Sequence, residues 1–363
     1  MMLEMDSQEG RLKGMQNKKV TIIDVAKAAG VSIGAVSRIL SNDPKLNVRA
    51  ETRESVHKII AELGYTPNPQ ARGLRLARTN SFAMIVPEID SPAFPAIIQG
   101  AQMAAQERGY SMLLGGVGEN GEDPELANRL LKRNRVDGLL ISTGRREPAS
   151  MSELKTLKAP SVLVNRFLDD AHPHVILDDH QGAAAIVRHL LELGHRRIAF
   201  VGELKRFLGT RRISGYKAAL QDAGISFDPE LTIDAGYDRE GGEMGIHRLL
   251  ALAQRPTAVF ATNHLVAAGV LLGTQRTGLS VPEDLSIASF YDGPVAELLN
   301  PALTAVRFPL ERLGSEAAFM LMDIIENRDV PTSKILPYDT IVVRGSTAAV
   351  PGTIRRVPSA SRN

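Results

Sequence analysis

Hydrophobic residues near the start of the chain recur with a helical period. An apolar stripe at i, i+3, i+4 and i+7 consists of Ile22, Val25, Ala26 and Ala29. Thr21 is placed to cap this helix, Asp24 adds negative charge to its first turn, and Gly30 suits the positive φ at which helices often end. The pattern therefore predicts a short amphipathic helix that ends in a tight turn.

A second helical pattern follows directly after this turn. Ser32 is a candidate cap for a helix over residues 33–40, with Val36, Ile39 and Leu40 facing inward. A helix, a glycine turn and a second capped helix are typical of a helix-turn-helix, whose second helix enters the major groove of DNA. The same pattern would also fit a small αα-hairpin with no role in DNA binding.

A third helix and an uneven distribution of charge favour DNA. Residues 51–63 carry apolar residues at core spacing and are followed by Gly64; these apolar residues are Val56, Ile59, Ile60 and Leu63. Residues 18–79 contain 11 Lys and Arg against 5 Asp and Glu, a net charge of +6 in a chain whose total is +2. Positive charge gathered at one end of the chain is what binding to phosphates requires.

The same stretch carries short motifs that resemble the lactose/galactose-repressor (LacI/GalR) family. These motifs are Val20-Thr21-Ile22, Asp24-Val25-Ala26, Ala29-Gly30-Val31-Ser32, Val36-Ser37-Arg38, Glu51-Thr52-Arg53, Leu63-Gly64-Tyr65, Pro67-Asn68, Ala71-Arg72 and Leu74. The resemblance continues more loosely to about Thr347. It implies an all-α helix-turn-helix DNA-binding domain followed by an α/β, two-lobed, periplasmic-binding-protein-like (type I) core.

The resemblance also implies which residues contact DNA. They are Thr21, Ser32, Ile33, Gly34, Ser37, Arg38, Tyr65, Asn68, Ala71 and Leu74. In the family, the segment that contains Leu74 becomes helical on the operator, and paired leucines from two subunits enter the minor groove. Ile33 and Gly34 occupy base-reading positions that are often polar, and Arg49 stands where Ser usually caps the third helix. The operator sequence therefore stays open, and a flexible linker is the alternative for the segment around Leu74.

From residue 81 onward, short apolar runs alternate with helical patterns. Strands are expected at 82–86, 110–114, 136–142, 161–164, 198–201, 258–261 and 286–290. Helices are expected at 97–108, 124–134, 152–158, 181–193, 212–223, 240–253, 265–277 and 311–327. This alternation predicts parallel sheets, and its length favours two lobes over one. The resemblance implies three crossings between the lobes, which we place near Leu177, Ala305 and Val330.

These patterns predict a chain of five parts. They are a flexible leader (1–19), the helix-turn-helix domain (20–66), a hinge helix and linker (67–79), an effector-binding and dimerisation core (80–347) and a flexible tail (348–363). Within the core, lobe 1 is expected at about 80–177 and 306–330, and lobe 2 at about 178–305 and 331–347.

Composition removes several classes of protein. The content of 44% hydrophobic and 23% charged residues is ordinary for a soluble globular protein, and the absence of Cys excludes disulfides and thiolate metal sites. Residues 1–19 lack the apolar core of a secretory signal, and no apolar run approaches the ~20 residues that span a bilayer. We therefore expect a cytoplasmic protein.

Two motifs are typical of dinucleotide binding and of zinc binding, but the residues around them do not favour either function. Residues 116–121 match G-x-G-x-x-G, yet the next helix begins after the glycines, and acidic residues nearby would repel a pyrophosphate. His172, His174, Asp178, Asp179 and His180 could bind zinc, but a strand separates them, and solvated loop residues are expected. We expect no metal, no cofactor and no enzymatic activity.

A cluster of polar residues at expected strand ends predicts an effector site. Its candidate residues are Asn165, Arg166, Arg206, Arg212, Tyr237, Asn263 and Asp292, and the resemblance adds Phe94 as a further pocket position. Arg and Asp together can bracket vicinal hydroxyls or a carboxylate, although each alone could form a surface salt bridge. The resemblance implies that Arg212 and Asp292 contact the effector, and Arg206 matches a position used by purine-binding members.

Departures from the family pattern leave the effector's identity open. His264 stands where the family usually has Asp, Ala93 replaces a common aromatic residue, and Asn165 replaces a frequent Asp.

The sequence thus predicts a DNA-binding transcriptional regulator, with repression as the expected action. It is expected to bind near-palindromic double-stranded operator DNA as a homodimer or dimer of dimers, through helices 97–108 and 265–277, under control of a sugar or sugar derivative. A nucleobase or sugar acid is the alternative effector, and the effector could act as inducer or co-repressor. The alternative class is a solute-binding protein without DNA function, which would have no use for residues 20–74.

Overall fold

The chain divides into two units, Met1–Thr79 and Asn80–Asn363, each of which is described by itself. The computed structural model describes residues 20–40, 46–65, 78–87, 91–116, 129–131, 135–142 and 159–350. The expected leader, most of the hinge segment and the last thirteen residues of the tail lie outside these ranges. So do most of the helices expected at 124–134 and 152–158, of which only 129–131 is described, as helix.

The first unit is a bundle of three short helices. They are α2 (Ile22–Ala29), α3 (Ile33–Leu40) and α4 (Ala50–Leu63). Their shared core consists of Val25, Ala26, Val36, Ile39 and Val56. Leu63 is 38% exposed, so its prediction as a core residue is wrong: the helix ends there, beyond the reach of α2 and α3.

The turns of this unit follow from their capping residues. Gly30 has φ +64°, and the N–H of Val31 donates to the carbonyl of Ala26, which completes a Schellman motif at the end of α2. The Ser32 hydroxyl accepts a hydrogen bond from the N–H of Ala35 at 3.1 Å and so caps α3, which confirms the prediction. The Asp24 carboxylate accepts from the N–H and the hydroxyl of Thr21. These local bonds fix the angle between α2 and α3.

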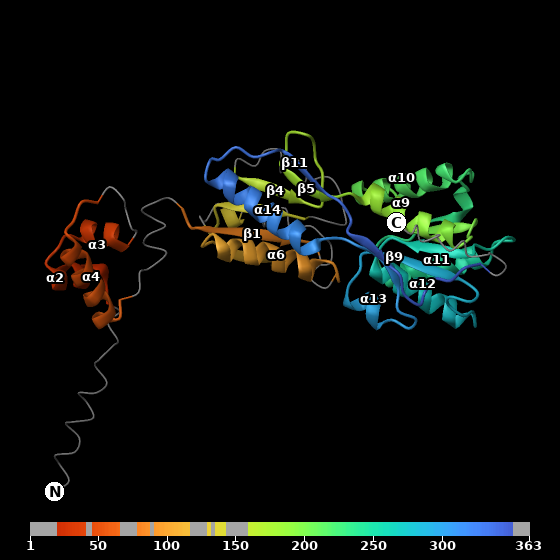
Figure 1. The fold of residues 1–363 in the computed structure, drawn as a ribbon, viewed down its shortest axis with the longest axis horizontal. Helices are drawn as coiled ribbons and strands as arrows, with labels where there is room; N and C mark the ends of the chain where they lie inside the picture. Colours follow the sequence, from red (N-terminus) through yellow and green to blue (C-terminus); the bar gives the residue numbers. More distant parts are fainter. Residues whose placement is uncertain are drawn as a thin grey trace, which may run out of the picture. The chain divides into compact units, whose positions relative to one another are not determined.

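The second unit contains two six-stranded sheets (Figure 1). In spatial order, the first comprises β11 (Ser333–Leu336), β5 (His174–Leu177), β4 (Ser161–Val164), β3 (Gly138–Ile141), β1 (Ser81–Val86) and β2 (Ser111–Gly116). The second comprises β12 (Thr340–Val342), β10 (Thr304–Arg307), β9 (Ser286–Phe290), β8 (Ala258–Ala261), β6 (Ile198–Gly202) and β7 (Thr232–Asp234). All described pairings are parallel except that of β10 with β12. The carboxyl ends of the parallel strands therefore meet at one edge of each sheet.

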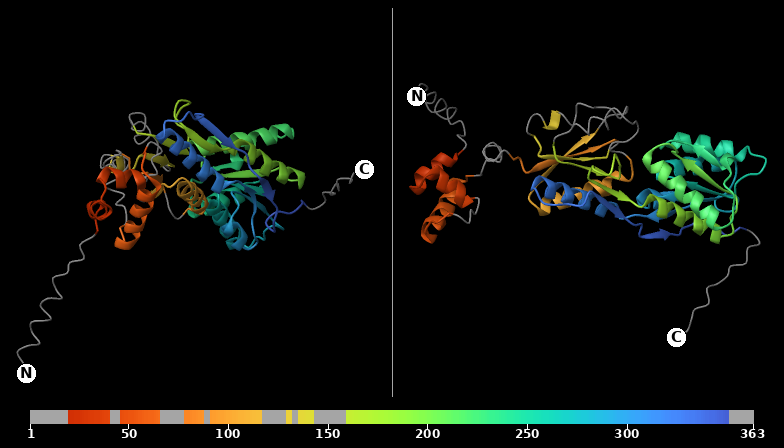
Figure 2. Two further views of the ribbon diagram at one scale, coloured as in Figure 1. Left: turned by 60° about the vertical axis from the view of Figure 1, so that its left-hand side comes forward. Right: turned by 90° about the horizontal axis from the view of Figure 1, so that it is seen from above.

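Helices pack on these sheets in pairs (Figures 1 and 2). The first sheet carries α6 (Phe94–Glu107) and α14 (Leu310–Ile325) on one face. The second sheet lies between the pair α9 (Asp179–Glu192) and α10 (Phe207–Asp222) and the pair α11 (Arg239–Leu250) and α12 (His264–Arg276). Two short helices, η1 (Pro229–Leu231) and α13 (Pro294–Leu298), lie in its connections.

Glycines set the distance between α6 and α14. A Cβ atom on Gly314 would lie 1.9 Å from the carbonyl oxygen of Ile97, and one on Gly100 would lie 1.8 Å from that of Glu311. Neither contact is possible, so only glycine allows the two backbones to come this close.

The chain passes between the sheets three times, after Leu177, after Arg307 and after Leu336. Ala305 lies within β10 of the second sheet, and Val330 precedes β11, which pairs with β5 of the first sheet. The second and third crossings therefore come later than predicted. We hereafter call residues 80–177 and 310–336 lobe 1, and residues 178–307 and 340–347 lobe 2.

The strands that decide the late crossings were not expected from the sequence. β11 is mostly exposed and β12 has only three residues, so neither shows a buried apolar run. None of the described helices is long and apolar enough to cross a membrane.

Candidate functional site

Four of the ten residues predicted to contact DNA lie in α3, Ser32 caps this helix, and Thr21 caps α2. Thr21, Ser32, Ile33 and Arg38 are exposed, while Gly34 and Ser37 are half-buried. Ile33 is 46% exposed although it is a large apolar residue, and it sits in the first turn of α3. An aliphatic side chain there is suited to contact the methyl group of thymine in the major groove.

Of the other four residues predicted to contact DNA, the structure describes one. Tyr65 is half-buried and packs against the core of the three helices. Asn68, Ala71 and Leu74 lie outside the described residues.

A cavity lies between the two lobes, at the carboxyl ends of strands from both sheets. Open α/β sheets bind ligands at this edge. The lining residues are Pro87, Ser91, Pro92, Ala93, Phe94, Ile97, Ser142, Asn165, Arg166, Leu208, Arg212, Tyr237, Asn263, His264, Leu265 and Tyr291. Six of the eight residues predicted for the effector site are among them, and Arg206 and Asp292 are not.

Arg212 is the most connected residue of the cavity wall. It is 2% exposed, and its Nε donates to Asp179 Oδ1 at 2.7 Å, its Nη1 to the carbonyl of Thr262 at 2.8 Å and its Nη2 to Tyr291 Oη at 2.5 Å. Its guanidinium also lies 4.3 Å from the ring centroid of Phe290. Burial opposes its charge, but Tyr291 and Asp179 outweigh burial and raise the pKa of Arg212. Arg212 therefore remains charged and ties together the ends of β8 and β9 and the start of α9.

Tyr291 joins the lobes through its hydroxyl. The side-chain amide of Asn165, at the end of β4, donates to Tyr291 Oη at 3.3 Å, and Asn165 Oδ1 accepts from the N–H of Leu177 at 3.1 Å. Asn165 and Tyr291 both have positive φ, +51° and +68°, which is unusual for residues with a side chain. Backbone of this kind is found where a site holds a side chain in a required direction. The sequence did not single out Tyr291, because a tyrosine after an apolar strand carries no distinctive signal.

The side-chain amide of Asn263 makes its described hydrogen bonds with the protein's own backbone. Its Oδ1 accepts from the N–H of Val266 at 2.9 Å, and its side-chain amide donates to the carbonyl of Tyr237 at 3.2 Å. Asn263 thus caps α12 and positions Tyr237 beside the cavity.

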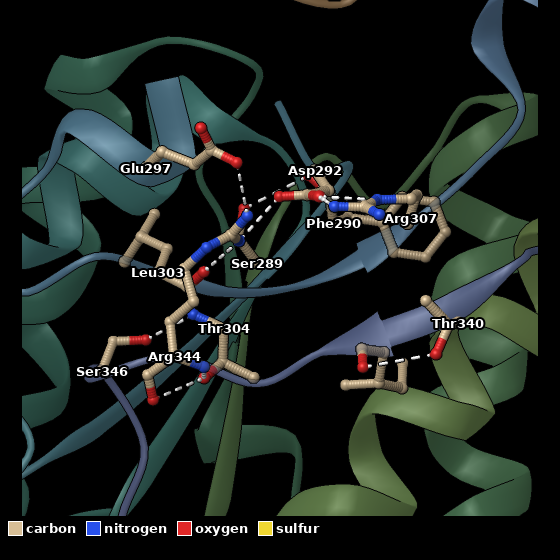
Figure 3. A network of polar contacts seen from close by, with 11 residues as sticks. Ser289, Phe290, Asp292, Glu297, Leu303, Thr304, Arg307, Thr340, Arg344 and Ser346 are labelled. Atoms are coloured by element: carbon tan, nitrogen blue, oxygen red, sulfur yellow. Dashed lines mark hydrogen bonds and ion pairs between the residues drawn. The ribbon is translucent and has the colours of Figure 1, made fainter. Parts of the chain in front are cut away.

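Asp292 is not among the residues that line the cavity, and it lies in an ion-pair network with Arg307 and Arg344 (Figure 3). Its Oδ2 accepts from Nε and Nη2 of Arg307 at 2.9 and 2.6 Å, and its Oδ1 accepts from Nη1 of Arg344 at 2.7 Å. Arg344 also donates to Glu297 at 3.0 Å. Burial opposes the charge, but hydrogen bonds from Arg344 and Arg307 lower the pKa of Asp292.

Asp292 thus pairs with Arg307 and Arg344 and not with Arg212, and the meeting of Arg212 and Asp292 at one ligand stays a prediction. The positive φ of Tyr291 turns the chain so that Tyr291, not Asp292, faces Arg212. Arg206 also lies outside the cavity lining: it precedes α10, and its guanidinium lies 5.9 Å from the ring centroid of Tyr237.

An aromatic stack links the lobes outside the cavity. The ring of Phe167, in the loop after β4, stacks on that of Phe207, the first residue of α10, at 5.5 Å. The guanidinium of Arg211 lies 5.6 Å from the Phe207 ring centroid and pairs with Asp178 at 3.5 Å. This stack joins a lobe 1 loop to the first turn of a lobe 2 helix.

Three of the five residues considered as zinc ligands make contacts with different partners. His172 contacts Ser161, His174 contacts the carbonyl of His172, and Asp179 pairs with Arg212. Within the described ranges, no three His, Cys, Asp or Glu side chains are placed to hold a metal ion. Residues 117–121 of the glycine loop lie outside the described residues.

Both units of the chain match models of known protein families. Residues 21–68 match the model of bacterial regulatory proteins of the lacI family, and residues 187–347 match that of a periplasmic binding protein-like domain. The HTH-type transcriptional repressor CytR of Escherichia coli (strain K12) is 35% identical over 340 residues, which cover 93% of this chain and 98% of that protein. The chain belongs to the LacI family. It is a DNA-binding transcriptional regulator, and the family consists of regulators and not of enzymes.

Other LacI-family members share the architecture. The ribose operon repressor of Haemophilus influenzae is 31% identical over 328 residues, covering 90% of this chain and 98% of that protein. The structure of the transcriptional regulator CelR–cellobiose complex superposes with a TM-score of 0.69 at 31% identity, covering 90% of this chain and 99% of that one. A lac repressor dimer bound to operator and the anti-inducer ONPF gives 0.79 at 26% identity, covering 92% and 100%.

His264 departs from the LacI-family pattern. Its burial makes the stability of the unit formed by residues 80–363 depend on pH. Burial lowers the pKa of His264 to about 4, and Nε2 has no hydrogen-bond partner among the described residues. The unfolded chain takes up a proton near pH 6.5 but the folded chain only near 4, so stability falls as pH drops through this window. At pH 5 the loss from His264 should be about 2 kcal/mol.

Urea unfolding of the wild type and His264→Gln at pH 7.5 and 5 measures this loss. The variant should lose about 2 kcal/mol less than the wild type on acidification. His247→Gln, at an exposed position of α11, is the matched control and should behave as the wild type. An equal loss in His264→Gln would show that His264 is not the group that titrates.

Proposed function

We propose that this regulator reads an operator half-site with α3 and that a small molecule in the interlobe cavity controls its affinity for DNA. A second copy of the chain would read the other half-site of a near-palindromic operator. Two similar structures support this proposal by their descriptions: one is a dimer bound to operator, and the other is a complex with cellobiose. Sugars and sugar derivatives are accordingly the first effectors to test.

The Arg212–Tyr291–Asn165 chain of hydrogen bonds is the observation that carries the proposal. It starts in lobe 2, runs along the cavity wall and ends in lobe 1. A ligand that enters the cavity must meet these groups, so occupancy and lobe arrangement are coupled. Allosteric control requires that a ligand make different contacts in two states of the protein, and a ligand bound to these groups would do so.

The segment that joins the two units is proposed to carry the effect to DNA. The predicted hinge helix would place Leu74 in the minor groove, opposite the same residue of the second copy. Minor-groove wedging would depend on the distance between the two hinge segments, and this distance would change with the lobes.

Replacing Leu74 with alanine should weaken operator binding by about tenfold or more, because the wedge contributes only to the specific, kinked complex. Fluorescence anisotropy with operator DNA and with a scrambled duplex of equal length separates the two modes. The operator itself is obtained by selection from random duplexes with the full chain. Leu76→Ala, on a different face of the same predicted helix, is the matched control.

Scrambled DNA should bind Leu74→Ala and the wild type alike, since phosphate contacts do not involve Leu74. Undiminished operator affinity in Leu74→Ala would remove the hinge from the mechanism. Failure to select any operator would contradict the proposed function.

A further inference from the structure

The cavity wall offers a ligand mostly hydrogen-bond donors. Tyr291 Oη already accepts two hydrogen bonds, from Arg212 and Asn165, so its own hydroxyl hydrogen remains to be donated. Arg212 has five N–H groups, and the described bonds use three of them. Arg166 lines the same cavity and is a donor only, and one of its five N–H groups donates to the carbonyl of Asn165 at 2.7 Å.

Acceptors in the cavity are few by comparison. Among the described residues of its lining, none is Asp or Glu. The amide oxygens of Asn165 and Asn263 each already accept one hydrogen bond from the backbone. Other side-chain acceptors of the lining include the hydroxyls of Ser91 and Ser142 and, in one tautomer, Nε2 of His264, which has no partner among the described residues.

Three carboxylates near the cavity are not part of its lining. Asp179 Oδ1 accepts from Arg212 while its buried Oδ2 has no partner among the described residues, and Asp292 accepts from Arg307 and Arg344. Glu203 accepts from the backbone N–H groups of Lys205 and Arg206 at 2.6 and 2.7 Å, and from the hydroxyl of Tyr237 at 3.3 Å. A polyol needs acceptors for its hydroxyl hydrogens, and this wall does not supply carboxylates for them.

We propose that the effector is a small acid whose carboxylate or phosphate is held by Arg166, Arg212 and the Tyr291 hydroxyl. This proposal rests on the proposed function, because it assigns a ligand class to the same cavity. Arginine is the side chain best suited to the planar oxygens of such groups, and hydrogen bonds to charged groups are about twice as strong as neutral ones. Tyr291 is then a residue that determines specificity, since its hydroxyl adds a donor beside Arg212.

The protonation of these groups agrees with the geometry. Burial raises the pKa of Tyr291, so its hydroxyl keeps its proton at neutral pH and can donate it to an anion. Burial lowers the pKa of Arg166, while Tyr237 and Tyr291 oppose this effect. Desolvation thus disfavours the charged guanidinium of Arg166, and a bound anion would offset part of this cost.

Isothermal titration calorimetry of the full chain with matched pairs tests the proposal. The pairs are D-gluconate with D-glucose and ribose 5-phosphate with ribose, and inorganic phosphate alone is the ion control. At least one acid should bind tenfold or more tightly than its neutral partner, because a charge-assisted hydrogen bond corresponds to roughly tenfold to a hundredfold in affinity. The pair that responds distinguishes a carboxylate from a phosphate ligand.

Substitutions then assign the binding to this wall. Tyr291→Phe keeps the ring but removes the donor, and it should weaken binding of the acid about tenfold while leaving any binding of the neutral partner nearly unchanged. Tyr216→Phe is the matched control, because that hydroxyl is buried and donates to the carbonyl of Ile198, away from the cavity. Thermal unfolding of each variant confirms that it is folded.

The outcomes separate the two proposals. A neutral sugar that binds as tightly as its acid, and loses affinity in cavity variants, would overturn the acid proposal and leave the proposed function intact. Acid binding that survives both Tyr291→Phe and Arg166→Gln would place the ligand outside this cavity and count against both. Binding of inorganic phosphate as tight as that of ribose 5-phosphate, or no binding of either acid, would also overturn the acid proposal.

Discussion

Replacing Arg212 with methionine should destabilise the unit formed by residues 80–363 by roughly 3–5 kcal/mol, because it strands a buried carboxylate. Asp179 is fully buried, and Arg212 Nε is its hydrogen-bond partner at 2.7 Å. Methionine fills much of the same volume but offers neither charge nor donor. Urea unfolding, followed by circular dichroism, measures the loss.

Two further variants identify the cause of this loss. Arg211→Met removes the neighbouring arginine, whose ion pair with Asp178 is more than one-quarter exposed at 3.5 Å, and it should cost less than about 1 kcal/mol. Arg212→Met combined with Asp179→Asn removes the stranded charge and should recover part of the stability. If the double variant is no more stable than Arg212→Met, the lost contacts to Thr262 and Tyr291 are the main contribution, and the stranded charge is not.

Raising the salt concentration from 50 to 200 mM should weaken DNA binding by about 10³- to 10⁵-fold, with a log–log slope on the order of −5 or steeper. The reason is the net charge of +6 on residues 18–79, which would release counterions from ~6–10 phosphates per dimeric complex. Fluorescence anisotropy of labelled operator across this range measures the slope. A slope near zero would be incompatible with binding through phosphates.

A pair of arginine substitutions assigns this effect to the first unit. Arg38→Gln lies on the exposed side of α3 and should make the slope shallower by about one for each phosphate contact that is lost. Arg255→Gln lies in the loop between α11 and β8, where it is exposed, and should leave the slope unchanged. An equal change in both variants would point to a general effect of net charge.

The helix-turn-helix could be predicted from the sequence because its determinants are local. Ser32 and Gly30 act on the backbone within four residues, and the apolar stripe of α2 repeats at the helical period. The buried strands could also be predicted, since runs such as Ile198–Gly202 are apolar throughout. In these elements, local preference and tertiary packing require the same structure.

The cavity could be predicted only in part, because side-chain direction depends on backbone angles that the sequence does not display. Asn165, Arg166, Arg212, Tyr237 and Asn263 follow from the rule that ligands bind at the carboxyl ends of parallel strands, and Phe94 follows only from the family resemblance. The exchange of Asp292 for Tyr291 does not, since it depends on a positive φ at a tyrosine. The later crossings were also missed, because β11 is short and half exposed and gains its place only by pairing with β5.

The stack of Phe167 on Phe207 has a consequence for how affinity can be tuned. An opening of the cleft that separates these rings would lose the pair, which contributes about 0.5–1.5 kcal/mol, or roughly two- to tenfold in the ratio of closed to open molecules. If the ligand binds only the closed form, its apparent dissociation constant is the intrinsic constant divided by the closed fraction. Selection could therefore adjust the effector concentration at which the regulator responds by changing two rings outside the cavity lining, with every group in the lining left as it is.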